Sequence, residues 1–279
     1  MPIAPLPWRI LGQTGQSVTL FGLGGEGVLR THGRAKEAVR VIQRALDQGV
    51  TYCDTAPAYA SSLDYYGAAL GERRRQIFLA SKTHDRTRDG SLRLLDDSLR
   101  RLRTDHLDLW QLHDLRTPAD LDRIFGKGGA LEALVHARAQ GRVRFFGVTG
   151  HHDPAILLEA MRRFSFDTVL VALNPADNHR LPFIPTVLAE AQRKGMGVIA
   201  MKTLAAGRLA RVMSSAEALS YAWSLPGVSL AIVGCSTPEE VDENVRAARV
   251  FTLLSEQQLR TLEERIRPRA ADYGYFKRD

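Results

Sequence analysis

The 279-residue sequence has few cysteines and no long apolar run. Its two cysteines, Cys53 and Cys235, lie far apart within apolar stretches, so we expect buried, reduced thiols and no disulfide framework. It contains no run of about 18 uncharged apolar residues, which argues against a membrane span. The opening MPIAPLPWRI also lacks the basic and apolar regions of a secretion signal. These absences predict a cytoplasmic protein without a membrane partner.

Positive charge is in modest excess, with 38 Lys and Arg against 31 Asp and Glu and a net charge of +7. The basic runs at 72–76 and 100–103 have acidic neighbours and no interleaved aromatic residues. We interpret them as solvated helix faces and expect no nucleic-acid partner. A basic surface would still help to attract an anionic small molecule.

The stretch FGLGGEGVLR, residues 21–30, contains glycines in the G-x-G-x-x-G order of a Rossmann turn. Such a turn needs a helix that opens at its third glycine. Here the helical pattern starts only near Arg34, after VLRTHG. We therefore interpret the glycines as part of a loop, where they allow the backbone to approach a ligand closely.

Apolar strand patterns alternate eight times with amphipathic helical patterns. Strands are expected at 19–24, 50–56, 77–82, 107–113, 143–150, 168–174, 197–203 and 229–235. Helices are expected at 35–49, 62–72, 90–104, 130–141, 154–164, 183–195, 215–227 and 238–250, with a further helix at 254–266. Residues 8–20 are expected to form a hairpin that caps the floor of the barrel. The pattern predicts an α/β fold, a (β/α)8 TIM barrel, as one domain over 1–279.

In such barrels the reacting residues gather at the carboxyl ends of the strands. Polar residues end several of the apolar runs, namely Asp54, Lys82, His113, Asn174 and Lys202. Any one of them alone could be a buried polar group satisfied by the backbone. Asp54, Lys82 and His113 end three successive strands, however, and Tyr59 follows Asp54 by five residues. We expect these four side chains to converge at one mouth.

These four residue types suit proton donation to a carbonyl oxygen. A lysine ammonium beside a tyrosine favours the phenolate, so Lys82 is expected to lower the pKa of Tyr59 from about 10. Asp54 would keep Lys82 charged, and His113 would donate a hydrogen bond to a substrate carbonyl. Tyr59 would act as the general acid, while a nicotinamide cofactor supplied the hydride.

The runs YCDTAPAYASSLDYYGAALGE, LASKT and DHLDLWQLHD resemble the aldo-keto reductase superfamily, as an atypical member of the bacterial type. The resemblance extends from LGQTGQSVTLFGLGG to IVGCSTPEEVDENVRAA. It implies a barrel that binds NADPH at its mouth and reduces aldehydes or ketones. It also implies that the catalytic tetrad is Asp54, Tyr59, Lys82 and His113.

The resemblance further implies a set of cofactor-binding residues: Gly24, Gly25, Thr149, Gly150, Asn174, Met201, Lys202, Leu204, Gly207, Gly234, Ser236, Thr237, Glu240, Glu243 and Asn244. Thr149-Gly150 replaces the usual Ser-Asn, Leu170 replaces a Gln, and Met201 replaces an aromatic residue that covers the nicotinamide ring. Glu240 falls where many members place an arginine on the 2′-phosphate. NADP is therefore expected first, with NAD as the alternative.

His151, His152 and Asp153 follow the fifth strand. Adjacent histidines lack the spacing that aims two imidazoles at one ion, and no third ligand is evident, so no metal is expected. His151 is expected to face the cofactor or substrate. Lys202 is expected to anchor a phosphate or the substrate, with a Schiff-base role as the alternative.

Three functions remain open at this point. The complete tetrad favours reduction of a small-molecule carbonyl. A weakly catalytic regulatory barrel similar to potassium-channel beta subunits is the first alternative, and a lyase or aldolase using Lys82 or Lys202 is the second. The C-terminal segment RPRAADYGYFKRD is short, which predicts an open pocket. The sequence identifies neither the substrate nor the oligomeric state.

Overall fold

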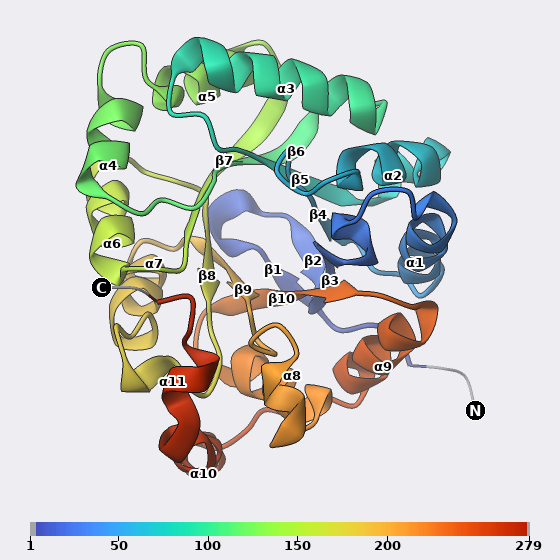
Figure 1. The fold of residues 1–279 in the computed structure, drawn as a ribbon, viewed down its shortest axis with the longest axis vertical. Coiled ribbons are helices and arrows are strands. Elements are labelled where there is room, and N and C mark those ends of the chain that lie inside the picture. The colour runs from blue at the N-terminus through green and yellow to red at the C-terminus, as the bar shows by residue number, and fades with distance from the viewer. Residues whose placement is uncertain (1–3, 278–279) are drawn as a thin grey trace.

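Eight parallel strands form a closed barrel in the computed structural model, which describes residues 4–277 (Figure 1). They follow the chain in order, and β10 pairs with β3 to complete the circle, with Ala231 opposite Phe21. The expected (β/α)8 TIM barrel is thereby confirmed. The strands are β3 (Phe21–Gly27), β4 (Tyr52–Asp54), β5 (Phe78–Thr83), β6 (Leu107–Leu112), β7 (Val143–Gly150), β8 (Thr168–Ala172), β9 (Gly197–Met201) and β10 (Val228–Cys235).

Helices surround the barrel, and their apolar faces pack on the outside of the strands (Figure 1). They are α1 (Ala35–Asp47), α2 (Ser62–Ala69), α3 (Arg88–Leu102), α4 (Pro118–Phe125), α5 (Ala130–Ala139), α6 (Pro154–Arg163), α7 (Ala189–Arg193), α8 (Ser215–Ser224), α9 (Pro238–Arg249), α10 (Glu256–Ile266) and α11 (Ala270–Tyr273). No helix within residues 4–277 is long and apolar enough to cross a membrane.

Several helical segments, the short α11 among them, differ from the sequence-based expectation. Helix α4 was not expected, although Thr117 and Asp120 cap its start reciprocally and Pro118 occupies the first turn. The helix expected at 62–72 ends at Ala69, where a 3-10 segment over Gly71–Gln76 takes over. The helix expected at 183–195 begins with a π turn over Ile184–Leu188 before α7.

The N-terminal hairpin closes one end of the barrel, as expected. Strands β1 (Trp8–Ile10) and β2 (Ser17–Thr19) pair antiparallel. Leu11, between them, is fully buried with barrel-interior residues such as Leu109 and Ile199. A Cβ on Gly12 would lie 2.1 Å from the backbone nitrogen of Gly197, where β9 starts. Because the hairpin seals the amino ends of the strands, the open mouth lies at their carboxyl ends.

The two cysteines are free and buried, as expected. Cys53 lies in β4 and Cys235 ends β10. Burial raises the pKa of each thiol to about 12, so both remain protonated at neutral pH. Neither behaves as a reactive thiolate.

Candidate active site

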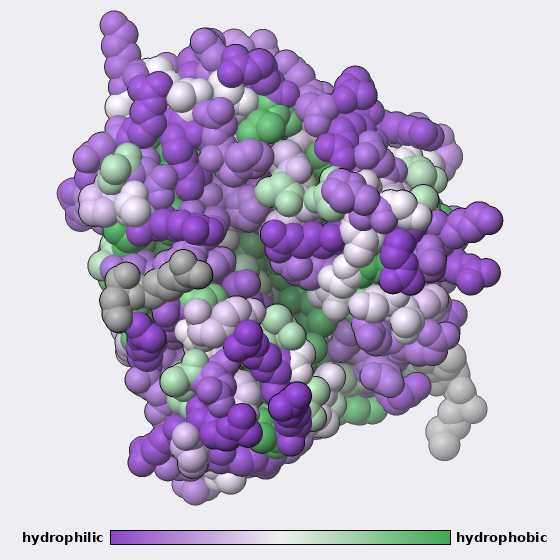
Figure 2. Space-filling model, in the orientation of Figure 1, coloured by the Kyte–Doolittle hydropathy of each residue, from purple (hydrophilic) through white to green (hydrophobic). Residues whose placement is uncertain are grey.

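A cavity of about 960 Å³ opens at the carboxyl ends of the strands. Figure 2 shows it as a hollow near the centre of this face, with hydrophobic residues toward its bottom. Its size is at the upper end for small-molecule sites. Among the residues that line it are Asp54, Tyr59 and His113, while Lys82 is fully buried beneath them.

A buried ion pair lies under the floor of the cavity. Lys82 Nζ, on β5, donates hydrogen bonds to Asp54 Oδ1 and to the carbonyl oxygen of Thr55, the latter at 2.9 Å. The second carboxylate oxygen, Asp54 Oδ2, accepts from Gln111 Nε2 at 3.2 Å. Since an unpaired buried charge is strongly unfavourable, each partner holds the other in the charged form.

The electrostatic balance keeps Lys82 protonated. Burial alone would lower the pKa of Lys82, but the Asp54 carboxylate and Tyr59 outweigh it, so the pKa lies above its usual 10.5. Burial raises the pKa of Asp54, and the contact with Lys82 opposes that rise. The structure therefore places a fixed ammonium directly below the cavity.

Tyr59 and His113 meet above this ion pair. Tyr59 Oη lies 3.5 Å from His113 Nε2, and Lys82 Nζ is 4.9 Å from the centre of the Tyr59 ring. The two rings are arranged edge to face with their centres 5.6 Å apart. The four residues that the sequence singled out are thus brought to one point.

The pKa of Tyr59 differs in direction from the sequence-based expectation. Burial of the hydroxyl raises the pKa above 10, and the Lys82 ammonium lowers it by less than burial raises it. The expected effect of Lys82 is present, but the expected net lowering is wrong for the protein alone. Tyr59 therefore carries its proton throughout the neutral range.

His113 is a neutral imidazole. Burial, followed by the charge of Lys82, lowers its pKa well below 6.5. A neutral ring has one N–H to donate and one lone pair, so it can hydrogen-bond to a carbonyl oxygen without adding charge. Its backbone is fixed by Arg86, whose guanidinium donates to the carbonyls of His113 and Asp114 at 2.8 and 3.0 Å.

Gln111 and Arg86 were missed by the sequence analysis. Gln111 lies inside the apolar run LDLWQLH and not at the end of the strand, so it did not stand out as a site residue. Every second residue of such a strand faces the barrel interior, and Gln111 is one of these. Arg86 follows β5 by three residues, and this position after a strand end was the available signal.

The glycine stretch continues strand β3 rather than forming the expected loop, and Gly24, Gly25 and Gly27 line the cavity. Strand β3 extends through it to Gly27, followed by a 3-10 turn rather than a Rossmann helix. A Cβ on Gly25 would lie 2.4 Å from Cδ2 of Tyr59 and 3.1 Å from the carbonyl oxygen of Asp54. Gly25 therefore leaves the space that the Tyr59 ring occupies.

Comparison with known proteins identifies the family. A profile of the aldo/keto reductase family matches residues 21–217. The chain belongs to this family. L-galactose dehydrogenase of Arabidopsis thaliana is 26% identical, covering 92% of this chain and 92% of its own.

Solved structures of aldo/keto reductases share the fold. A Klebsiella pneumoniae aldo/keto reductase in complex with NADP and acetate is 26% identical, with a TM-score of 0.76 over 92% of this chain and 94% of that chain. An aldo-keto reductase from Bacillus halodurans, in its holo form, has a TM-score of 0.78 at 23% identity, over 93% and 96% of the two chains.

Most of the cofactor positions implied by the aldo/keto reductase resemblance line the cavity. They are Gly24, Gly25, Thr149, Met201, Lys202, Leu204, Gly207, Gly234, Ser236, Glu240, Glu243 and Asn244. Three expected positions are not among the lining residues: Gly150, Asn174 and Thr237.

Each of these three makes a structural contact in the protein alone. The Asn174 amide donates to the Lys202 carbonyl at 3.1 Å and accepts from the Ala176 nitrogen at 2.9 Å. Thr237 caps α9 by accepting from the Glu240 nitrogen. A Cβ on Gly150 would face Leu115 and Leu157 rather than the cavity. Their assignment as cofactor contacts stays a prediction.

Part of the cavity lining is apolar. Leu170, Met201 and Ile232 line it, and Thr149 adds a hydroxyl. Leu170 and Thr149 are almost completely buried. Dispersion contacts rather than amide hydrogen bonds therefore dominate this part of the cavity.

Lys202 begins a strained loop at the mouth. Lys202, Ala205 and Ala206 all have positive φ, at 54°, 46° and 54°. Such backbone is uncommon for residues with a Cβ and concentrates at functional sites. Burial lowers the pKa of Lys202, and its Nζ lies 5.4 Å from the centre of the Phe276 ring.

The C-terminal segment, although short, reaches the mouth of the cavity. Tyr275 lines the mouth, and the Phe276 ring meets His151 edge to face, with ring centres 5.7 Å apart. Lys277 fixes the segment through Asp177, whose carboxylate it contacts, and through the carbonyl of Arg180 at 2.9 Å. A short tail suffices because its end is held by a buried ion pair.

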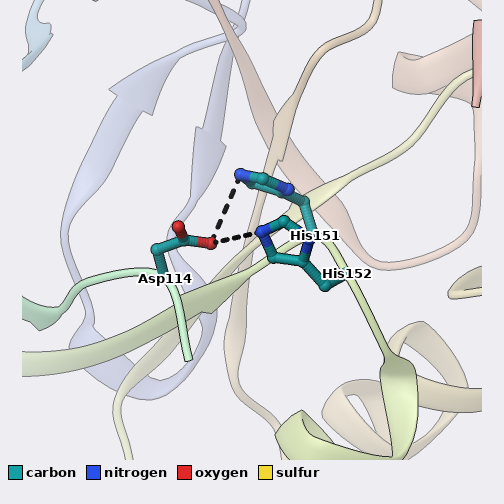
Figure 3. A group of neighbouring side chains, drawn as sticks. All are labelled: Asp114, His151 and His152. Atoms are coloured by element: carbon teal, nitrogen blue, oxygen red, sulfur yellow. Dashed lines mark ion pairs between the residues drawn. The ribbon is translucent and has the colours of Figure 1, made fainter. Parts of the chain in front are cut away.

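The loop after β7 corrects a further expectation. The Nε2 atoms of His151 and His152 each lie 3.3 Å from Oδ1 of Asp114, which follows β6 (Figure 3). Adjacent histidines therefore do converge on one point, and a third potential ligand is present. The premise that no third ligand is evident was wrong, because Asp114 comes from the neighbouring strand end.

Proposed function

We propose that this protein reduces an aldehyde or ketone to an alcohol, with NADPH as the expected cofactor and NADH as the alternative. The observation that carries the proposal is the meeting of the Tyr59 hydroxyl and the His113 imidazole in the cavity, above the buried Lys82–Asp54 pair. Membership of the aldo/keto reductase family and the NADP complex of the Klebsiella pneumoniae relative support it.

The cavity fits a nicotinamide dinucleotide in its chemistry. The apolar lining residues Leu170, Met201 and Ile232 suit a flat ring. Lys202 also lines the cavity and provides a positive charge suited to a pyrophosphate. Near the cavity residue Ser236, the start of α9 offers the backbone N–H groups that helix N-termini present to anions.

Each member of the tetrad has a defined part in the proposed reduction. A nicotinamide cofactor, when bound, would supply the hydride that the carbonyl carbon takes up. The Tyr59 hydroxyl gives its proton to the carbonyl oxygen, so that an alcohol forms. His113 donates a hydrogen bond that polarises the same oxygen, and Lys82 stabilises the negative charge left on Tyr59. Asp54 holds Lys82 in position.

A direct test follows NADPH consumption by the purified protein across a panel of aromatic and aliphatic aldehydes and ketones. Reduction would support the proposal. Tight cofactor binding without turnover would instead favour a regulatory barrel. Borohydride trapping of a substrate imine on Lys82 or Lys202, without any nicotinamide, would replace the proposal with a lyase or aldolase.

Changing Gly25 to Ala should impair this reaction without unfolding the barrel. The new methyl group would lie 2.4 Å from Tyr59 Cδ2, so the ring must move. A displacement of about 1 Å can cost on the order of 10²-fold in rate, and we expect a loss of that size in kcat. The measurement is NADPH oxidation, with circular dichroism to monitor the fold.

Gly274→Ala is the matched control, because a Cβ there meets nothing closer than 3.5 Å. It should retain its turnover. If Gly25→Ala were equally active, the tyrosine would not depend on this space, and the role given to Gly25 would be wrong.

Glu240 is expected to weaken binding of the 2′-phosphate. It lines the cavity, and its Oε2 accepts from the Ser236 backbone nitrogen at 2.6 Å, near the start of α9. A carboxylate there repels a phosphate by about 1 kcal/mol at contact distances in water. We expect Glu240→Gln to raise the affinity for NADPH, relative to the affinity for NADH, about fivefold. Fluorescence titration with each cofactor measures the two affinities.

The glutamine in this variant can still accept from Ser236, so the loop should be preserved. Glu239→Gln is the control, since it removes one charge from the same helix turn at a residue that is not among those lining the cavity. An unchanged ratio in Glu240→Gln would show that the carboxylate does not face the phosphate.

A further inference from the structure

Three potential metal ligands converge beside the active-site cavity. Asp114 follows β6, and His151 and His152 follow β7, the next strand of the barrel. Figure 3 shows both imidazoles directed toward the same side of the Asp114 carboxylate. One ligand atom from each of the three residues lies within 4.8 Å of the others.

The distances match the spacing of ligands around a tetrahedral ion. Both Nε2 atoms are 3.3 Å from Asp114 Oδ1. Zinc binds imidazole nitrogen and carboxylate oxygen at about 2.0 Å, and two ligands at tetrahedral positions are then about 3.3 Å apart. The two spacings to Oδ1 therefore equal those between ligands of a zinc-sized ion, and the ligand atoms of the two histidines lie within 4.8 Å of each other.

Hydrogen bonding does not account for this convergence. Asp114 Oδ1 is buried and accepts no hydrogen bond from any group in residues 4–277, although both rings are close. His151 Nδ1 is likewise buried with no hydrogen-bond partner among those residues. Buried polar atoms in native proteins are almost always satisfied, so an orphaned carboxylate oxygen between two imidazoles points to a missing cation.

Charged side chains lie next to the cluster. Arg116 donates to Asp114 Oδ2, at 2.8 Å from its Nε, so only Oδ1 is free to bind an ion. Arg116 and Lys202 are positively charged neighbours, so a bound cation must overcome their repulsion.

We propose that Asp114 Oδ1 and the Nε2 atoms of His151 and His152 bind a divalent transition-metal ion, with Zn²⁺ as the best match. Two imidazoles and one carboxylate are a ligand set that this ion takes in proteins. Asp114 and His151 line the cavity that contains Tyr59 and His113. The fourth coordination position is thus available to water or to an oxygen of a small molecule in the cavity.

The test uses the full chain, stripped with a chelator and then titrated with Co²⁺ and Zn²⁺ alone. We expect one equivalent of Zn²⁺ by calorimetry, and visible Co²⁺ absorption bands of a low-symmetry site, displaced by Zn²⁺. Asp114→Asn and His152→Asn should each weaken Zn²⁺ binding at least about tenfold. Zn²⁺ should also raise the melting temperature of the unmodified protein more than that of either variant.

His106→Asn is the control, because His106 forms a surface pair with Asp105 at 2.7 Å, away from the cavity. It should bind Zn²⁺ as the unmodified protein does. Circular dichroism must show that each variant folds. If the unmodified protein binds no Zn²⁺, or if folded Asp114→Asn and His152→Asn bind it as tightly as His106→Asn, the proposal is wrong. None of these readouts depends on reductase activity.

Discussion

Replacing Tyr59 by Phe is expected to lower the rate of carbonyl reduction by about 10²–10⁴-fold, the range found for loss of a general acid. The change removes the hydroxyl that lies 3.5 Å from His113 Nε2 and leaves the ring in place. Because the ring still packs against Gly25 and Lys82, binding of NADPH should be nearly unchanged. The measurements are kcat from NADPH oxidation and the dissociation constant from fluorescence.

Tyr65→Phe is the control that separates this loss of rate from the general cost in stability of removing a tyrosine hydroxyl. The Tyr65 hydroxyl donates to the Thr31 carbonyl at 2.9 Å, and Tyr65 is not among the residues that line the cavity. This control should lose about 1 kcal/mol of stability and keep its turnover. Substantial reductase activity in Tyr59→Phe would rule out Tyr59 as the proton donor.

The direction of the Tyr59 pKa bears on the pH range of this chemistry. A general acid works only while protonated, so activity is lost as the pH rises through its pKa. Burial places that pKa above 10 in the protein alone. The sequence revealed the effect of the Lys82 charge on the pKa of Tyr59. It did not reveal the cost of burying a phenolate, because that cost depends on surroundings that no local pattern shows.

The barrel was predictable because it follows from repetition along the chain. Eight similar units place every strand end at one mouth, so Asp54, Lys82 and His113 could be expected to meet. The same logic was available for Asp114 and His151, which follow neighbouring strands. The spacing of the two histidines alone did not reveal their convergence on Asp114.

Other features depend on contacts that carry no local sequence signature. The buried pair of Lys277 with Asp177 joins residues 100 positions apart. It brings Tyr275 and Phe276 to the mouth, so the length of the tail was a poor guide to whether it reaches the cavity. By contrast, α4 was signalled by Thr117, Pro118 and Asp120, and this capping pattern was overlooked.

Changing Lys82 to Met should reduce both stability and turnover, for different reasons. Lys82 is fully buried, and its removal leaves the Asp54 carboxylate without its counter-charge. Breaking a buried pair in this way costs about 3–5 kcal/mol of unfolding free energy. Turnover should fall at least about 10²-fold, because Tyr59 loses the ammonium that stabilises its phenolate. Urea unfolding and NADPH oxidation measure the two effects.

The double variant Lys82→Met with Asp54→Asn distinguishes the two roles of the ion pair. It buries no unpaired charge, and the asparagine can still accept from Gln111, which contacts the present carboxylate at 3.2 Å. Replacing a buried ion pair by neutral groups is often close to neutral, so most of the lost stability should return. Turnover should stay low, because the charge beneath Tyr59 is still missing. If turnover returned with stability, Lys82 would serve only to neutralise Asp54, and its part in proton transfer would have to be abandoned.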